Sequence, residues 1–185
     1  KTTDFKRIID TLGPVFVKPI SEGSSIGMFV AKTEDDLSRA TAKASELGSG
    51  VIAEQLIEGS EYTVSILGHE ALPVIQIETN NSFYDYDAKY ISEETIYHCP
   101  TDLSNKDLET IKALSMRAFK SIGCEVWGRV DLMRDCNGNF FVLEVNTVPG
   151  MTAHSLVPKS ASAANMSMQD LVLRIISLSL AGSES

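Results

Sequence analysis

Basic residues, cysteines and long apolar runs are scarce in this chain, and each scarcity argues against a class of protein. Lys and Arg number 16 against 25 Asp and Glu, a formal charge of −9, which argues against broad nucleic-acid binding because that requires a basic surface. The three cysteines lack CxxC or metal-site spacing, which favours a reduced, cytoplasmic setting over a disulfide framework. No apolar run reaches about 18 residues and no signal-peptide pattern is present, so no membrane partner is expected.

The 185 residues, 43% hydrophobic and 22% charged, suit one substantial domain or two small ones. Helical and strand patterns are mixed without a regular strand–helix–strand rhythm, which predicts an α+β fold of two subdomains rather than a doubly wound sheet. We expect the subdomains to be 1–58 and 59–185. Because the chain opens directly on a helical pattern without an initiator Met, we also expect it to be the carboxy-terminal part of a longer protein.

Hydrophobic periodicity and turn residues locate the individual elements. Thr33 with Asp36 resembles a capping box, and Ser104 is a second candidate N-cap. Residues 80–100 are polar and irregular, and a loop of that length inside a compact domain is usually functional, often a lid. The expected helices are 3–12, 34–47, the segment after Ser104 and 167–180, and the expected strands are 15–18, 26–31, 51–53, 61–67 and 71–79.

A hairpin is predicted around Asn137-Gly138, because this dipeptide between apolar runs is typical of a two-residue turn. With that turn, Asp131 lies opposite Glu144 and Arg129 lies opposite Asn146. Strand side chains alternate, so these four residues share one face of the hairpin. The other face is predicted to be the core face and carries Val130, Leu132, Leu143 and Val145.

The two facing carboxylates predict a cation site. Directly opposed residues have Cβ atoms about 4.5–5.5 Å apart, where like charges repel, so Asp131 and Glu144 call for a cation between them. Carboxylates and the amide oxygen of Asn146, without soft ligands, suit Mg²⁺, which usually shares its coordination shell with nucleotide phosphates. The alternative is two solvated acids on an exposed sheet face.

A second candidate site is the loop 22–27, which joins two expected strands and carries two glycines and two serines. Its backbone amides and hydroxyls suit phosphate oxygens, although a loop of this kind is often only a turn. Lys18 stands just upstream in an apolar strand, where an unpaired ammonium would be costly and a bound phosphate would satisfy it. The alternatives for Lys18 are a salt bridge or a side chain that reaches the surface.

Glu54 and Glu61 flank the expected subdomain boundary, a favoured place for a flat ligand. Either acid could accept hydrogen bonds from adenine or ribose. Since surface acids are common, the spacing by itself favours neither a binding role nor a structural one.

Several sequence runs, taken together and in order, are far more specific than any single motif. They are VKP at 17–19, EGSSIGM at 22–28, FYDYDAKY at 83–90, WGRVD at 127–131, LEVNTVPGMT at 143–152 and HSLVP at 154–158. In combination they resemble the D-alanine–D-alanine ligases of the ATP-grasp superfamily, over nearly the whole chain. The resemblance implies an ATP-grasp fold, in which two α+β subdomains hold the nucleotide between them. Residues 1–58 would be the lid subdomain, and residues 59–185 would be the core subdomain with the metal and substrate site.

The resemblance also implies roles for individual residues. ATP would be bound by Lys18, Ser24, Ser25, Glu54, the Leu56 backbone, Glu61 and Lys89. Mg²⁺, with two ions expected and Mn²⁺ as a substitute, would be bound by Asp131, Glu144 and Asn146, in agreement with the hairpin register. The catalytic and substrate-binding residues would be Arg129 and the Gly150 amide at the reacting carboxyl group, Ser155 and Leu156 at the second D-alanine, and Tyr90 with Ser24 in the lid network.

The activity implied is the ATP-dependent, ADP-forming joining of two D-alanine molecules through an acyl phosphate, for peptidoglycan precursors in a bacterial cytoplasm. Tyr90 beside Lys89 resembles the D-alanine type rather than the D-lactate- or D-serine-using relatives. The family's amino-terminal domain is missing, so we expect the isolated chain to be inactive and the full-length protein to be a homodimer. The alternatives are another ATP-grasp carboxylate–amine ligase and an ATP-binding fragment without turnover.

Overall fold

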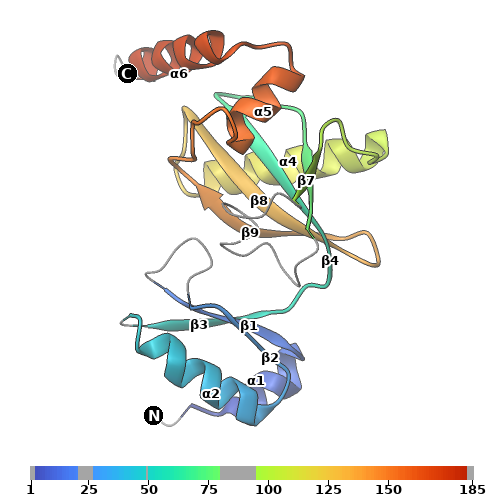
Figure 1. Cartoon of the computed structure of the whole chain (residues 1–185), viewed down its shortest axis with the longest axis vertical. Coiled ribbons are helices and arrows are strands. Elements are labelled where there is room, and N and C mark those ends of the chain that lie inside the picture. The colour runs from blue at the N-terminus through green and yellow to red at the C-terminus, as the bar shows by residue number, and fades with distance from the viewer. Residues whose placement is uncertain (1–2, 21–26, 49, 80–94, 183–185) are drawn as a thin grey trace. The chain divides into compact units, whose positions relative to one another are not determined.

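The computed structural model describes residues 3–20, 27–48, 50–79 and 95–182 (Figure 1). The chain divides into two compact units, of which the first comprises Lys1–Ile57 with Thr79–Thr95 and the second Glu58–Glu78 with Ile96–Ser185. The chain first passes between them after Ile57, next to the expected boundary at residue 58. The assignment of the two subdomains as lid and core stays a prediction.

The first unit is a small antiparallel sheet covered by two helices (Figure 1). Within its described residues the strand order is β2-β1-β3. The core forms between the sheet and α2, whose Leu37, Ala40 and Ala44 pack on Val15 and Val17 of β1. The elements are α1 (Phe5–Leu12), β1 (Val15–Pro19), β2 (Phe29–Ala31), α2 (Glu34–Ser45) and β3 (Val51–Gln55).

The predicted capping box of α2 is confirmed. The Thr33 side chain accepts a hydrogen bond from the Asp36 amide at 3.1 Å, and the Asp36 carboxylate accepts one from the Thr33 amide at 3.2 Å. These bonds satisfy amides that have no partner inside the helix, and they hold the pKa of Asp36 below its usual value. The helix ends at Ser45 rather than at Leu47.

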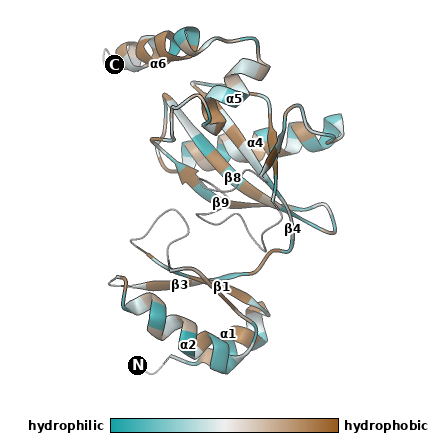
Figure 2. Cartoon of the chain, viewed as in Figure 1, coloured by the Kyte–Doolittle hydropathy of each residue, from teal (hydrophilic) through white to brown (hydrophobic). Residues whose placement is uncertain are grey.

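The second unit is a larger antiparallel sheet with helices packed against it. The described strands follow the order β7-β6-β4-β8-β9, and β5 pairs with β4 as a side branch. Figure 2 shows hydrophobic and hydrophilic segments side by side on α4, and the buried Ile111 and Phe119 of this helix pack on the sheet. The elements are β4 (Gly59–Leu67), β5 (Glu70–Ala71), β6 (Ile75–Glu78), β7 (Ile96–His98), α4 (Asn105–Ser121), β8 (Trp127–Asp135), β9 (Phe140–Asn146), α5 (Leu156–Ala163) and α6 (Met168–Gly182).

The central strand β4 is buried from Tyr62 to Leu67. Such continuous burial follows from packing on both faces. Val64 and Ile66 belong to the core cluster under α4, whereas Leu67 belongs to the cluster with Val157 of α5 and Leu171 of α6. Across the described ranges, no helix combines the length and apolarity that crossing a membrane would need.

Two predicted strands differ from the structure. The strand expected over 71–79 is split into β5 and β6, because Pro73 has no amide hydrogen for a sheet ladder and its carbonyl instead accepts a bond from Ser160 Oγ at 2.6 Å. The strand expected over 26–31 begins only at Phe29. Residue 26 itself lies outside the described residues.

The predicted two-residue turn at Asn137-Gly138 is wrong. Residues 136–138 form a longer loop, because the Asp135 amide donates to the Asn139 carbonyl at 3.0 Å, and Gly138 takes a φ of 87° that favours glycine. Near the loop, Arg134 therefore pairs with Phe140, one position away from the predicted register.

The predicted pairing of the site residues is nevertheless confirmed. Asp131 pairs with Glu144, and Arg129 pairs with Asn146. A bulge between Asp131 and Leu132 leaves Leu143 as an extra residue on β9, and this residue restores the register that the longer loop had shifted. Leu143 was predicted to lie in the core, but the bulge leaves it 37% exposed, while Val130 and Leu132 are fully buried.

Candidate functional site

Asp131 is the centre of a polar cluster on the β8–β9 face of the second unit. The residue as a whole is 6% exposed, and its carboxylate accepts hydrogen bonds from three of the described side chains. Arg129 donates through Nε to Oδ1 at 2.8 Å and through Nη2 to Oδ2 at 2.7 Å. Thr63 Oγ1 donates to Oδ1 at 2.7 Å, and Asn146 Nδ2 donates to Oδ2 at 3.0 Å.

The Arg129 guanidinium partly meets the need for a positive charge that the facing carboxylates create. Its two-point contact is the strongest geometry for an arginine–carboxylate pair, and both side chains are mostly buried, at 16% exposed for Arg129 and 8% for Asp131. Glu144 receives less support, because it is exposed and, among the described residues, accepts from Asn146 Nδ2 at 3.3 Å. The negative charge that remains is therefore chiefly that of Glu144.

The oxygen atoms of this cluster suit the binding of a hard cation. The Asn146 amide hydrogens reach both Asp131 Oδ2 and Glu144 Oε1, so one polarised NH₂ group bridges the two carboxylates. Rotation of the amide about its last bond would present Oδ1 to a cation in place of the NH₂ group. Among the described residues no group of three His, Cys, Asp or Glu comes together. A cation here would thus rest on two carboxylates and an amide oxygen, a set typical of Mg²⁺ rather than Zn²⁺.

The candidate nucleotide residues of the first unit form a separate cluster. Lys18 Nζ lies 2.7 Å from Glu54 Oε2, with side chains 21% and 37% exposed. The salt bridge that was one alternative for Lys18 is therefore present, and Glu54 is placed beside the same ammonium that would hold a phosphate. The Leu56 amide donates to the Pro14 carbonyl at 2.8 Å, which fixes the chain at the end of β3.

The candidate residues for the second amino acid lie at the start of α5. Ser155 is the N-cap residue of this helix and Leu156 is its first residue, 6% exposed. Ser155 Oγ accepts a hydrogen bond from the Thr152 amide at 3.1 Å. A Cβ on Gly150 would lie 2.9 Å from Ser155 Oγ, so a larger residue at position 150 would displace this hydroxyl.

Several predicted site residues are not tested by this geometry. Ser24, Ser25, Lys89 and Tyr90 lie outside the described residues. Glu61 is half-buried on β4, between Met133 of β8 and Ile77 of β6. Its role at adenosine stays a prediction.

Thr63 is the residue that sequence reasoning missed. It is 1% exposed and lies directly opposite Asp131 in the β4–β8 ladder. The alternating pattern of 61–67 predicts a strand, but no local signal identifies β8 as its neighbour, because Thr63 and Asp131 are separated by 68 positions in the sequence.

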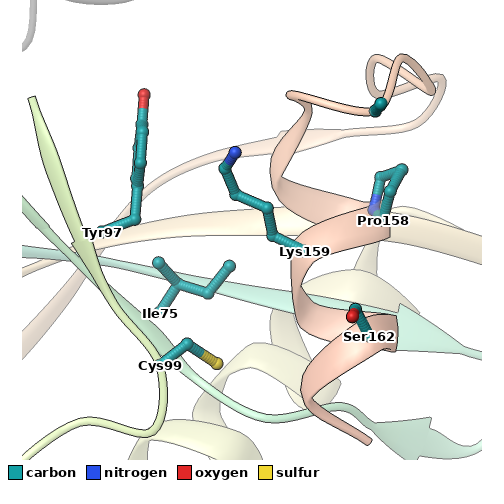
Figure 3. Close-up of a pocket in the computed structure, with 7 residues that line it drawn as sticks. Ile75, Tyr97, Cys99, Pro158, Lys159 and Ser162 are labelled. Carbon is teal, nitrogen blue, oxygen red and sulfur yellow. The ribbon is translucent and has the colours of Figure 1, made fainter. Parts of the chain in front are cut away.

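The second unit also contains a pocket that the sequence did not predict (Figure 3). Its volume is about 400 Å³, and Lys159 Nζ stands over the Tyr97 ring, 5.2 Å from the centroid. Burial raises the pKa of the Cys99 thiol, which lines the pocket below Ile75. The lining residues are Ile75, Tyr97, Cys99, Ala153, Pro158, Lys159 and Ser162.

Comparison with known proteins identifies the family. Residues 1–177 match the family model described as the D-ala D-ala ligase C-terminus. The chain is 49% identical, over 97% of its length, to a D-alanine–D-alanine ligase of Pseudoalteromonas translucida, and it covers 59% of that relative. It thus spans about three-fifths of the length of the curated relatives it matches.

Two solved structures of a D-alanine–D-alanine ligase from Bacillus anthracis resemble the chain over its full length. One has a TM-score of 0.86 at 36% identity, and the chain covers 60% of it. The other, solved in complex with ATP, has a TM-score of 0.84 at 34% identity, with 58% of it covered. The chain belongs to the family of D-alanine–D-alanine ligase C-terminal domains, and its fold is the ATP-grasp fold.

Proposed function

We propose that this chain is the ATP- and metal-binding part of a ligase that joins two D-alanine molecules and converts ATP to ADP and phosphate. The observation that carries the proposal is the Asp131–Glu144–Asn146 cluster with Arg129 beside it, in a chain of this family. The product would serve peptidoglycan precursor synthesis in a bacterial cytoplasm.

The reaction has two steps. The carboxylate of the first D-alanine attacks the γ-phosphorus of ATP, which forms an acyl phosphate and releases ADP. The amine of the second D-alanine then attacks the acyl carbon, loses a proton, and expels inorganic phosphate from a tetrahedral intermediate. Both steps require chiefly that the protein position the reactants and balance the developing charge.

The polar cluster would supply the charge balance in the second unit. Asp131, Glu144 and Asn146 would hold Mg²⁺, with two ions expected and Mn²⁺ as a substitute. The chemistry supplied at these residues would be positive charge that offsets the charge of the phosphate oxygens. Arg129 would face the reacting carboxyl group, and the Gly150 amide would donate to the oxygen that becomes negative in the tetrahedral intermediate.

Other residues would bind the reactants. Lys18, the loop containing Ser24 and Ser25, and Lys89 would contact the ATP phosphates, with Glu54, Leu56 and Glu61 around adenosine. Ser155 and Leu156 would hold the carboxylate of the second D-alanine at the α5 N-terminus, where backbone amides and the helix dipole favour an anion. Tyr90 and Ser24 would belong to a lid network that excludes water from the acyl phosphate.

About two-fifths of the length of the matched relatives has no counterpart in this chain. We infer that an amino-terminal domain outside this chain completes the site for the first D-alanine and that the isolated chain does not turn over. The full-length protein is proposed to be a homodimer without nucleic-acid or membrane partners. Its second substrate is proposed to be D-alanine rather than D-serine or D-lactate.

Phosphate release from Mg-ATP tests the proposal. The full-length protein and the isolated chain are each assayed with D-alanine, D-serine and D-lactate, and Asp131→Asn in the full-length protein serves as the site control. We expect D-alanine-dependent release by the full-length protein only, lowered at least about 100-fold in Asp131→Asn. ATP binding without release under any substrate would contradict the ligase assignment, and release with a different carboxylate–amine pair would indicate another ATP-grasp ligase. Normal turnover by Asp131→Asn would contradict the metal assignment.

A further inference from the structure

Among the described residues, three side chains donate hydrogen bonds to the Asp131 carboxylate. Two of them have another role in the proposed reaction. Arg129 would act on the reacting carboxyl group, and Asn146 would turn its amide oxygen toward a cation. The role of Asn146 competes with the hydrogen bond that its amide donates to Asp131. Arg129 would divide its five donors between Asp131 and substrate. Asp131 needs a partner that holds it in place while Arg129 and Asn146 engage other groups.

Thr63 is such a partner. Its hydroxyl lies 2.7 Å from Asp131 Oδ1 and 3.3 Å from the Val130 carbonyl oxygen, so the carboxylate is the closer acceptor. Thr63 lies on the central strand β4, directly opposite Asp131, so its backbone is fixed by the sheet ladder on both sides. Both side chains are at least nine-tenths buried, where a well-formed hydrogen bond is strong and an unpaired group is costly.

The geometry also divides the two carboxylate oxygens. Oδ1 accepts from Thr63 and from Arg129 Nε, whereas Oδ2 accepts from Arg129 Nη2 and is the oxygen that Asn146 bridges to Glu144. A carboxylate held at one oxygen presents the other in a fixed direction. Partners of this kind commonly change metal affinity about 10–100-fold when they are removed, although they do not touch the metal.

We propose that Thr63 is a positioning residue, which holds Asp131 Oδ1 so that Oδ2 is presented to the cation while Arg129 acts on substrate. The inference rests on the proposed function, since it requires that Asp131 bind a metal. Thr63 makes no contact with the metal, and its effect passes entirely through Asp131.

The test is direct measurement of Mn²⁺ binding by electron paramagnetic resonance, in the full-length protein with a non-hydrolysable ATP analogue. Thr63→Val keeps the shape of the side chain and removes the hydroxyl, and Thr63→Ser keeps the hydroxyl. The matched control is Ser65→Ala, because Ser65 is a buried hydroxyl on the same strand and face with no hydrogen-bond partner among the described residues. Thermal unfolding shows whether the valine variant folds. If it does not, Thr63→Ala takes its place and is compared with Thr63→Ser.

We expect Mn²⁺ affinity to fall about tenfold in Thr63→Val and to stay within about twofold of wild type in Thr63→Ser and Ser65→Ala. The apparent KM for metal should rise by the same factor while the KM for ATP stays unchanged. Wild-type Mn²⁺ affinity in Thr63→Val, alongside loss of binding in Asp131→Asn, would overturn the role of Thr63 and leave the proposed function intact. Wild-type affinity in Asp131→Asn would instead overturn the metal site and this inference with it.

Discussion

The burial of the charge pairs at the two candidate clusters determines how strongly a single substitution there affects folding as well as ligand binding. The Arg129–Asp131 pair is largely buried, so removing either member would leave the other charge desolvated and destabilise the fold by about 3–5 kcal/mol. The Lys18–Glu54 pair is more exposed, so its loss should cost the fold about 1 kcal/mol or less. Effects on ligand binding can therefore be separated from effects on folding more cleanly at Lys18 than at Arg129.

Replacing Lys18 by methionine should weaken ATP binding by the chain about tenfold, because a phosphate would lose a charge-assisted hydrogen bond while the apolar stem of the side chain is retained. Isothermal titration calorimetry with ATP measures the change. Arg39→Met is the matched control, since Arg39 also pairs with an acid in the first unit, Asp36, at 2.7 Å, but has no proposed ligand. An equal loss in both variants would point to general electrostatics instead of a phosphate contact.

At the scale of elements, the β8–β9 loop contains a carboxylate that should make stability depend on acid pH. Asp135 accepts hydrogen bonds from the Asn137 and Asn139 amides at 2.9 and 2.7 Å and from Asn139 Nδ2 at 3.0 Å. The Asn139 side chain is the largest cause that holds the pKa of Asp135 below its usual 3.8, followed by the Asn139 amide. Because the folded pKa is lowered, the stabilisation is complete above the unfolded pKa and is lost as the pH falls through the folded value.

We therefore expect the urea midpoint of the wild type to fall as the pH drops below about 4, and that of Asp135→Asn to fall less. The variant should be the less stable protein near neutral pH, since an amide cannot accept at both of its ends. Cys136→Ser in the same loop keeps the carboxylate and should retain the wild-type acid dependence. Parallel pH profiles for wild type and Asp135→Asn would show that Asp135 does not contribute to this dependence.

The same hairpin shows how far the sequence can predict a site. Alternation places Asp131 and Glu144 on one face, and that prediction is correct although the turn is longer than expected, because the bulge at Leu143 compensates for it. Loop length and bulges depend on hydrogen bonds such as that from the Asp135 amide to Asn139, which periodicity does not encode. Thr63 was not predicted for a related reason: its place beside Asp131 depends on the pairing of strands far apart in the chain.

For the whole molecule, sequence patterns predicted two α+β units but not their composition. The second segment of the first unit, Thr79–Thr95, follows β6 of the second unit, so the chain passes between the units more than once. Local patterns reveal the first passage, where β3 ends and β4 begins. Local patterns do not show where the chain returns to the first unit, because long-range contacts decide to which unit a segment belongs.

The two units have separate hydrophobic cores, which predicts separate responses to core damage. Leu37 belongs to the core of the first unit and Ile111 to that of the second, and both are at most 1% exposed. Replacing either by alanine removes buried methyl groups and leaves a cavity, at a cost of about 2–5 kcal/mol. We expect differential scanning calorimetry of the chain to resolve two transitions, with Leu37→Ala lowering the midpoint of one and Ile111→Ala that of the other. As controls, Ser38→Ala in α2 and Lys120→Ala in α4 change exposed residues of the same helices and should alter stability by less than about 0.5 kcal/mol. A single transition lowered equally by both core variants would show that the units unfold as one cooperative body, and the boundary near residue 58 would then have no thermodynamic meaning.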